Sequence, residues 1–133
     1  MEYDVEMTLL LDALWLIFGG GFVIALEYLV VGTLACLTVV GIPFGMQCFK
    51  IARLAAFPFG KDIRETPPAV PGGPVRLLLN VLWFVFAGLW IFLSHVGLGL
   101  ASALTIIGIP FALQHLKLAI LALWPFGRVA DVR

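Results

Sequence analysis

Two long apolar stretches, each followed by a shorter polar one, divide the chain into similar halves. Residues 7–49 carry only two formal charges, Asp12 and Glu27, and residues 77–116 carry none apart from two histidines. About 20 consecutive apolar residues allow one helix to cross a bilayer, so each stretch is long enough for two crossings. No alternation of apolar and polar residues favours a barrel, and helices are the other structure that can span lipid. The pattern therefore predicts an all-α integral membrane protein with four transmembrane helices.

Glycines and prolines place the ends of these helices. We expect the helices at residues 9–31, 33–57, 77–96 and 100–124. Gly32 would join the first pair, and Gly97 and Gly99 the second. The segment at 61–75 is rich in proline and glycine, which predicts a polar, non-helical linker. The expected domains are a membrane hairpin at 1–60, the linker at 61–75 and a second hairpin at 76–133. A version with three crossings stays open, in which the second helix of a pair lies partly along the interface.

The two halves are copies of one another. Residues 37–60 return at 104–127 with more than half of the aligned positions identical, and residues 11–15 match residues 79–83. Between these two matches the second copy is one residue shorter. Duplication of nearly a whole unit predicts two tandem hairpins of the same architecture.

The basic residues fall at one end of each predicted hairpin. They are Lys50, Arg53, Lys61, Arg64, Arg76, Lys117, Arg128 and Arg133. None lies near the predicted joins, so the positive-inside rule puts the linker and the C-terminus in the cytoplasm. With two crossings per hairpin, the N-terminus is cytoplasmic as well, and the repeat is parallel rather than inverted.

Composition excludes several classes of protein. The chain is 62% hydrophobic and 12% charged, and its mean hydropathy is +1.12, far outside the range of soluble domains. Its net charge is zero and it has no basic patch, so no nucleic-acid partner is expected. We find no nucleophile–base pair, no phosphate-binding glycine loop and no metal-ligand spacing, and therefore expect neither an enzyme nor a metal or cofactor site.

The sharpest local motif is Gly41-Ile42-Pro43-Phe44, which recurs as Gly108-Ile109-Pro110-Phe111. A proline inside a helix removes a backbone hydrogen bond and clashes with the carbonyl four residues earlier. We therefore expect the second helix of each hairpin to be kinked at Pro43 or Pro110. The kink either improves helix packing or lines a pore, where water satisfies the freed carbonyl.

Small residues recur along the same two predicted helices at spacings of three and four, which puts them on one face. They are Thr38, Gly41, Gly45, Cys48 and Ala52 in the first copy, and Thr105, Gly108, Ala112, His115 and Ala119 in the second. Small residues let helices approach closely in a membrane. The stripe predicts a packing seam, either inside the chain or between subunits.

Polar side chains within the apolar stretches are candidates for a transport pathway. They are Thr38, Gln47, Lys50, Thr105, Gln114, Lys117, Glu27 and His95. The two lysines follow the prolines in a Gln-x-x-Lys motif and either reach the cytoplasmic headgroups or stand at the mouth of an anion-permeable path. Direct alignment matches Glu27 with His95 near the outer end of the first helices, and an ionisable group inside a membrane is a functional candidate.

The paired Gly-Ile-Pro-Phe, Gln-x-x-Lys and Pro-Phe-Gly motifs, each preceded by Leu-x-x-Leu-Trp, resemble the YccF family of bacterial inner-membrane proteins. The resemblance covers nearly the whole chain. It implies an integral protein of the bacterial cytoplasmic membrane with a duplicated inner membrane component domain. It supplies no catalytic residues.

Once enzymes and nucleic-acid-binding proteins are set aside, two classes of function remain as hypotheses, transport and scaffolding. Four helices enclose only a thin interior, so a water-filled route is more easily built between subunits, and we expect a small homo-oligomeric ion channel. Lys50 and Lys117 favour anions, because they raise the local anion concentration. The competing hypothesis is a structural or regulatory subunit that packs against another membrane protein through the small-residue seam. Binding of lipid or a small amphiphile beneath the kinks is a third hypothesis.

Overall fold

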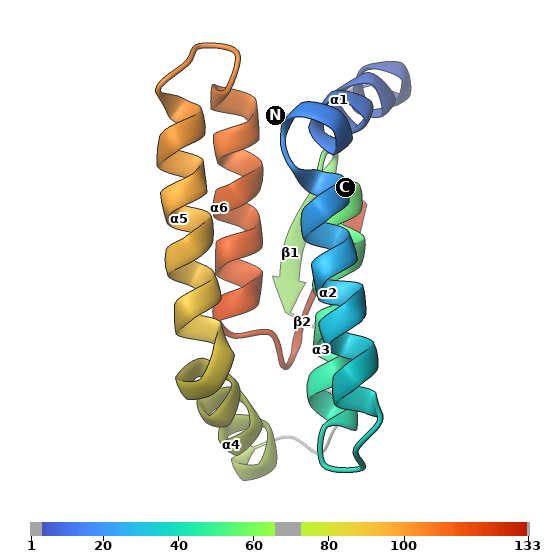
Figure 1. The fold of residues 1–133 in the computed structure, drawn as a ribbon, viewed down its shortest axis with the longest axis vertical. Helices are drawn as coiled ribbons and strands as arrows, with labels where there is room; N and C mark the ends of the chain where they lie inside the picture. The colour runs from blue at the N-terminus through green and yellow to red at the C-terminus, as the bar shows by residue number, and fades with distance from the viewer. Residues whose placement is uncertain (1–3, 66–72, 133) are drawn as a thin grey trace. The chain divides into compact units, whose positions relative to one another are not determined.

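The computed structural model describes residues 4–65 and 73–132, and this part of the chain is mostly helical (Figure 1). It divides into two compact units, the first extending to Asp62 and the second running from Ile63 to Asp131. The helices of the first unit are α1 (Val5–Phe18), α2 (Gly21–Cys36) and α3 (Ile42–Ala56). Those of the second are α4 (Pro74–Trp83), the π-helical η1 (Phe84–Gly88), α5 (Leu89–Ala103) and α6 (Ile109–Leu123).

Within each unit, two helices pack side by side: α2 with α3, and α5 with α6 (Figure 1). The chain turns between them at residues 37–41 and 104–108. The predicted joins at Gly32, Gly97 and Gly99 are therefore wrong, since all three glycines lie inside helices. Gly32 and Gly99 mark close helix contacts instead. A Cβ at Gly32 would lie 2.9 Å from that of Cys48, and one at Gly99 would lie 3.4 Å from the Ala112 carbonyl oxygen.

Pro43 and Pro110 begin helices rather than kink them. Each lies in the first turn, of α3 and α6 respectively, where its missing N–H costs nothing and its fixed φ suits the helix. The expected kinks at Gly-Ile-Pro are thus wrong, as are the expected helix starts at residues 33 and 100. The turns are as apolar as the helices around them, so the hydrophobic pattern ran through them without a break.

The one-residue difference between the copies decides whether the first helix is broken. In the first unit, Gly20 adopts a φ of +81°, and α1 and α2 are bent by 74° relative to each other. Glycine has no Cβ and takes this left-handed conformation readily. The shorter second copy stays helical through η1, a π-helical turn whose hydrogen bonds join residues five apart.

The length of these helices limits which of them can cross a membrane. Among the described residues, Pro74–Ala103 is a single helical stretch long and apolar enough to do so, and α1 with α2 would be another if the bent pair is one span. The shorter α6 is apolar but only 15 residues long.

Two short strands follow the helices, so the fold is mostly helical rather than all-α as expected. They are β1 (Lys61–Glu65) and β2 (Arg128–Val132), and they pair in a two-stranded sheet. Each comes directly after a Pro-Phe-Gly motif. β1 occupies the start of the predicted linker, residues 66–72 of that linker lie outside the described residues, and α4 begins at Pro74.

Candidate functional site

A tryptophan closes the base of each hairpin. The Trp15 Nε1 atom donates a hydrogen bond to the Ala55 carbonyl at 2.6 Å, and Trp83 Nε1 donates to the Ala122 carbonyl at 2.5 Å. Both rings are buried. An indole N–H needs a partner when it is buried, and a carbonyl in the last turn of α3 or α6 supplies one. The repeated tryptophan therefore holds the start of each unit against the end of its hairpin.

A buried polar side chain next to each tryptophan holds the Pro-Phe-Gly turn. Asn80 Nδ2 donates to the Phe126 carbonyl and Asn80 Oδ1 accepts from the Phe126 N–H, both at 3.0 Å. In the first unit, an Asp12 carboxylate oxygen accepts from the Phe59 N–H at 3.1 Å. These bonds explain why two motifs far apart in the sequence are repeated together.

The two threonines of the expected pathway close the turns at the tips of the hairpins. Thr38 Oγ1 accepts from the Gly41 N–H and Thr105 Oγ1 from the Gly108 N–H, each at 3.0 Å. Each hydroxyl also donates to a carbonyl in the last turn of the preceding helix, at 3.0 and 3.1 Å. Both hydroxyls thus satisfy backbone groups of the turn.

The small-residue stripe packs inside the first hairpin. A Cβ at Gly45 would meet the Cys36 sulfur and would lie 2.6 Å from the Gly32 carbonyl oxygen. In the second hairpin Ala112 takes the place of Gly45 and faces Gly99. Within the described residues, the stripe therefore lies against the neighbouring helix of its own hairpin at Gly45 and Ala112.

Buried side chains face each other halfway along each hairpin. His95 Nδ1 lies 3.3 Å from His115 Nδ1, so one ring can donate a hydrogen bond to the other, and both are buried. At the corresponding positions of the first unit are Tyr28 and Cys48, which are also buried. His95 therefore corresponds to Tyr28, and the expected match with Glu27 is wrong, because the residue missing from the second copy precedes His95. The role of His115 as the partner of His95 was not predicted from the sequence.

The Gln-x-x-Lys motif forms a local pair on α6. Gln114 is buried, its Nε2 donates to the Pro110 carbonyl at 3.3 Å, and its Oε1 accepts from Lys117 Nζ at 2.7 Å. In the first unit, Gln47 Oε1 is buried and makes no hydrogen bond within the described part of the chain. The two copies of the motif therefore differ in how their amides are satisfied.

Glu27 is exposed on α2, toward the middle of the helix rather than near its outer end. Its neighbours on the helix surface, Val23, Leu26 and Val30, are exposed as well. The corresponding residue of the second copy is Ser94, which is also exposed. A carboxylate thus stands on a face that is otherwise apolar.

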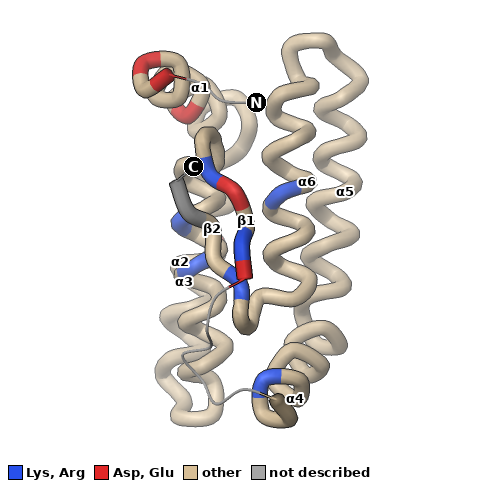
Figure 2. Tube along the Cα trace, turned by 180° about the vertical axis from the view of Figure 1, so that it is seen from behind, with Lys and Arg blue, Asp and Glu red and all other residues tan. Residues whose placement is uncertain are grey.

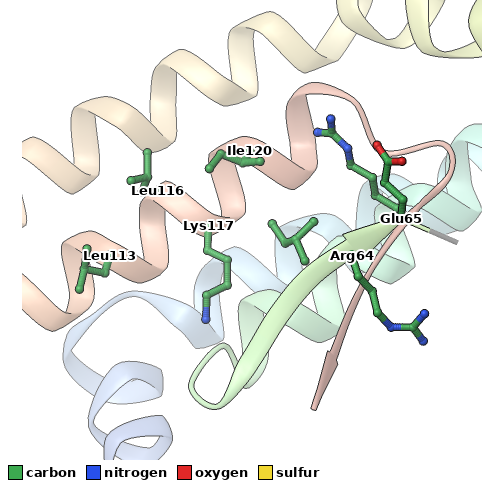
Figure 3. A pocket seen from close by; sticks show the side chains of 8 residues that line it. Arg64, Glu65, Leu113, Leu116, Lys117 and Ile120 are labelled. Atoms are coloured by element: carbon green, nitrogen blue, oxygen red, sulfur yellow. The ribbon is translucent and has the colours of Figure 1, made fainter. Parts of the chain in front are cut away.

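A groove of about 490 Å³ lies in the second unit between α6 and β1 (Figure 3). Its lining residues are Ile63, Arg64, Glu65, Leu113, Leu116, Lys117, Ile120 and Arg128. Figure 2 shows basic and acidic residues along β1 and a basic position on α6. The groove combines an aliphatic wall with a cationic end. Among the described residues, no group of three or more His, Cys, Asp or Glu side chains could hold a metal ion.

Comparisons with known proteins match most of the sequence. A family model described as the inner membrane component domain matches residues 10–61 and 78–128, one segment for each copy of the repeat. Relatives from Escherichia coli strain K12 and Shigella flexneri, both described as inner membrane protein YccF, are 33% identical over 115 residues. The alignment covers 82% of this chain and 78% of each relative. No solved structure matches.

Proposed function

Since the chain belongs to the YccF family and is an inner membrane component, we propose that it assembles as a homo-oligomer around a small ion-conducting pore. Each subunit enters the membrane from the cytoplasmic side as two tandem hairpins, with both termini and the linker in the cytoplasm. The outer surface of the hairpin helices is apolar along most of its length, as lipid contact requires. The cations lie away from the turns at residues 37–41 and 104–108.

Glu27 is the observation that carries the proposal. A charged side chain on a helix within a bilayer is costly unless it meets water, a partner group or the headgroups. Glu27 is exposed among exposed valine and leucine side chains, so a wholly lipid-facing position would leave its charge unsolvated. A water-filled route between subunits, lined by the outer face of α2, would solvate the carboxylate.

The charge of this residue also sets the ion preference that we propose. A carboxylate in a narrow route attracts cations and raises their local concentration. The sequence had favoured anions because of Lys50 and Lys117. Both lysines lie on the second helices of the hairpins, and Lys117 donates to Gln114 on its own helix. We therefore propose a cation-conducting pore.

Ion flux in liposomes tests this function. Vesicles containing the purified protein should conduct K⁺ in preference to Cl⁻. The Glu27→Gln variant should lower the K⁺ flux by about tenfold, because it removes the charge that concentrates the cation. Ser94→Ala, which alters the corresponding position of the second copy, serves as the control and should conduct like the unaltered protein. Impermeable vesicles that contain intact oligomers would refute the channel.

The same carboxylate supports a second function, that of a subunit bound to a different membrane protein through a basic group facing Glu27. A cysteine at position 27, in a chain whose Cys36 and Cys48 are replaced by Ala, separates the two proposals. Cross-linking to another copy of the chain supports the homo-oligomer. Cross-linking to a different protein supports the partner subunit.

A further inference from the structure

The groove on α6 has an aliphatic wall and a charged end. Leu113, Leu116 and Ile120 form the wall from one face of α6, and each is about half exposed. Leu113 and Leu116 lie toward the apolar turn at residues 104–108. These three side chains recur at intervals of three and four residues, so a hydrocarbon chain lying along the helix can contact all of them.

The charged end consists of Lys117 on α6 and of residues on β1 and β2. Lys117 projects from α6 into the space beside β1 (Figure 3). Arg128 also lines the groove, directly after the Pro-Phe-Gly motif. Arg64 and Glu65 of β1 also line this end. The Arg64 guanidinium is turned away from α6 in Figure 3, which leaves two cations, Lys117 and Arg128, beside one carboxylate.

We propose that this groove binds one anionic phospholipid. The phosphate accepts charge-assisted hydrogen bonds from Lys117 and Arg128. The Lys117 ammonium has three N–H donors, so it can bind the phosphate while it donates to Gln114. An acyl chain lies along Leu116 and Leu113 toward the apolar turn and covers their exposed aliphatic surface. Leu113 and Leu116 lie on the turn side of Lys117, and Ile120 lies between Lys117 and Arg128 along the chain. A headgroup at the two cations with an acyl chain running toward the turn therefore follows the order of groups in a phospholipid.

An anionic lipid fits better than a zwitterionic one because the cations outnumber the carboxylate. Free phosphate would use the charged end alone and leave the three aliphatic side chains without a role. The site belongs to a single unit of a single chain. It does not depend on ion conduction or on contacts between subunits.

Lipid-dependent stabilisation of the purified full-length protein tests the site. The protein in detergent is titrated with phosphatidylglycerol, phosphatidylethanolamine or inorganic phosphate while its thermal midpoint is followed, and native mass spectrometry counts the lipids retained. We expect phosphatidylglycerol to raise the midpoint most. In Lys117→Gln and in Arg128→Gln its apparent affinity should fall roughly tenfold or more, since each loses a charge-assisted hydrogen bond.

The duplication supplies the matched control. Lys50→Gln alters the same motif in the first unit, does not line this groove, and should bind phosphatidylglycerol like the unaltered chain. If the charge variants do not fold, Leu116→Trp keeps both cations, fills the aliphatic wall and should reduce the number of lipids retained. Equal stabilisation by phosphatidylethanolamine or by inorganic phosphate would overturn the proposal, as would equal losses in Lys50→Gln and Lys117→Gln.

Discussion

Polar residues within this apolar chain mostly satisfy backbone groups. Thr38 and Thr105 close the turns, the two tryptophans hold carbonyls at the hairpin bases, and Asn80 holds both polar atoms of Phe126. In lipid no water is available to hydrogen-bond an open backbone group. A side chain that hydrogen-bonds such a group therefore contributes more to the stability of the fold than its packing contacts alone.

Asn80 gives a prediction at this scale. Asn80→Ala would leave the Phe126 N–H and carbonyl without their partner at a buried site, so the free energy of unfolding should fall by about 1–3 kcal/mol. Thermal midpoints in detergent, followed by tryptophan fluorescence, measure the change. Asp12→Asn is the control and should be tolerated, since an amide makes both bonds in the second copy. Unchanged melting of Asn80→Ala would show that Phe126 finds other partners.

Individual glycines have opposite roles in the two copies of the helical hairpin. Gly20 precedes α2 in a left-handed conformation, and the chain direction changes between α1 and α2. Gly97 lies inside α5, and a Cβ added to it would meet nothing within 4 Å. The sequence assigned Gly97 to a turn, and the run Gly19-Gly20-Gly21 indicated a local weakening of the first helix, with a close contact or a hinge.

Alanine substitutions at these two positions should therefore change the free energy of unfolding in opposite directions. Gly20→Ala should lower the free energy of unfolding by about 1–2 kcal/mol, the cost of a left-handed conformation for a residue with a Cβ. Gly97→Ala should raise it by up to about 1 kcal/mol, because alanine loses less conformational entropy in a helix. Chemical or thermal unfolding of the two variants in the same detergent compares them. Equal destabilisation by both would mean that α5 is not helical at Gly97.

For the whole molecule, the turns at the hairpin tips bear on how the chain lies in the membrane. Leu37, Val39 and Val40 in the first turn and Leu104, Ile106 and Ile107 in the second are between 78% and 88% exposed. Burial of such surface away from water is favourable, and the threonines already satisfy backbone groups of the turns. We therefore expect the turns to stay in hydrocarbon. The sequence pattern, with two crossings per hairpin and both termini in the cytoplasm, had instead implied turns in water on the outer side. Helices α3 and α6 agree with this placement, since 15 residues span about 22 Å against a hydrocarbon core of about 30 Å.

Labelling of single cysteines tests the placement of the whole chain. In a chain without Cys36 and Cys48, Asp62→Cys and a cysteine added after the C-terminus should react with a membrane-impermeant maleimide from the cytoplasmic side only. Ile106→Cys should react from neither side. Labelling of position 106 from the outside would show that the turn is exposed to water. Labelling of Asp62→Cys and of the C-terminus from opposite sides would exclude the parallel layout.

The sequence by itself determined the class of protein, its duplication and its family. These follow from composition and from repeated motifs, because a chain surrounded by lipid must be apolar on its outside as well as its inside. The same uniform hydrophobicity hid the turns, so the helix starts at Ile42 and Ile109 could not be located from the apolar pattern.

Only the tertiary structure decided which residues act together. Asn80 meets Phe126 46 positions along the chain, Trp15 meets Ala55 40 positions along, and His95 meets His115 20 positions along. No local spacing encodes such pairs, since they depend on where each hairpin turns and on which helix faces come together. The alignment showed that the second copy lacks one residue. The place of that residue before Gly88, and its consequence, a continuous helix with His95 rather than Ser94 facing inward, required the packed helices.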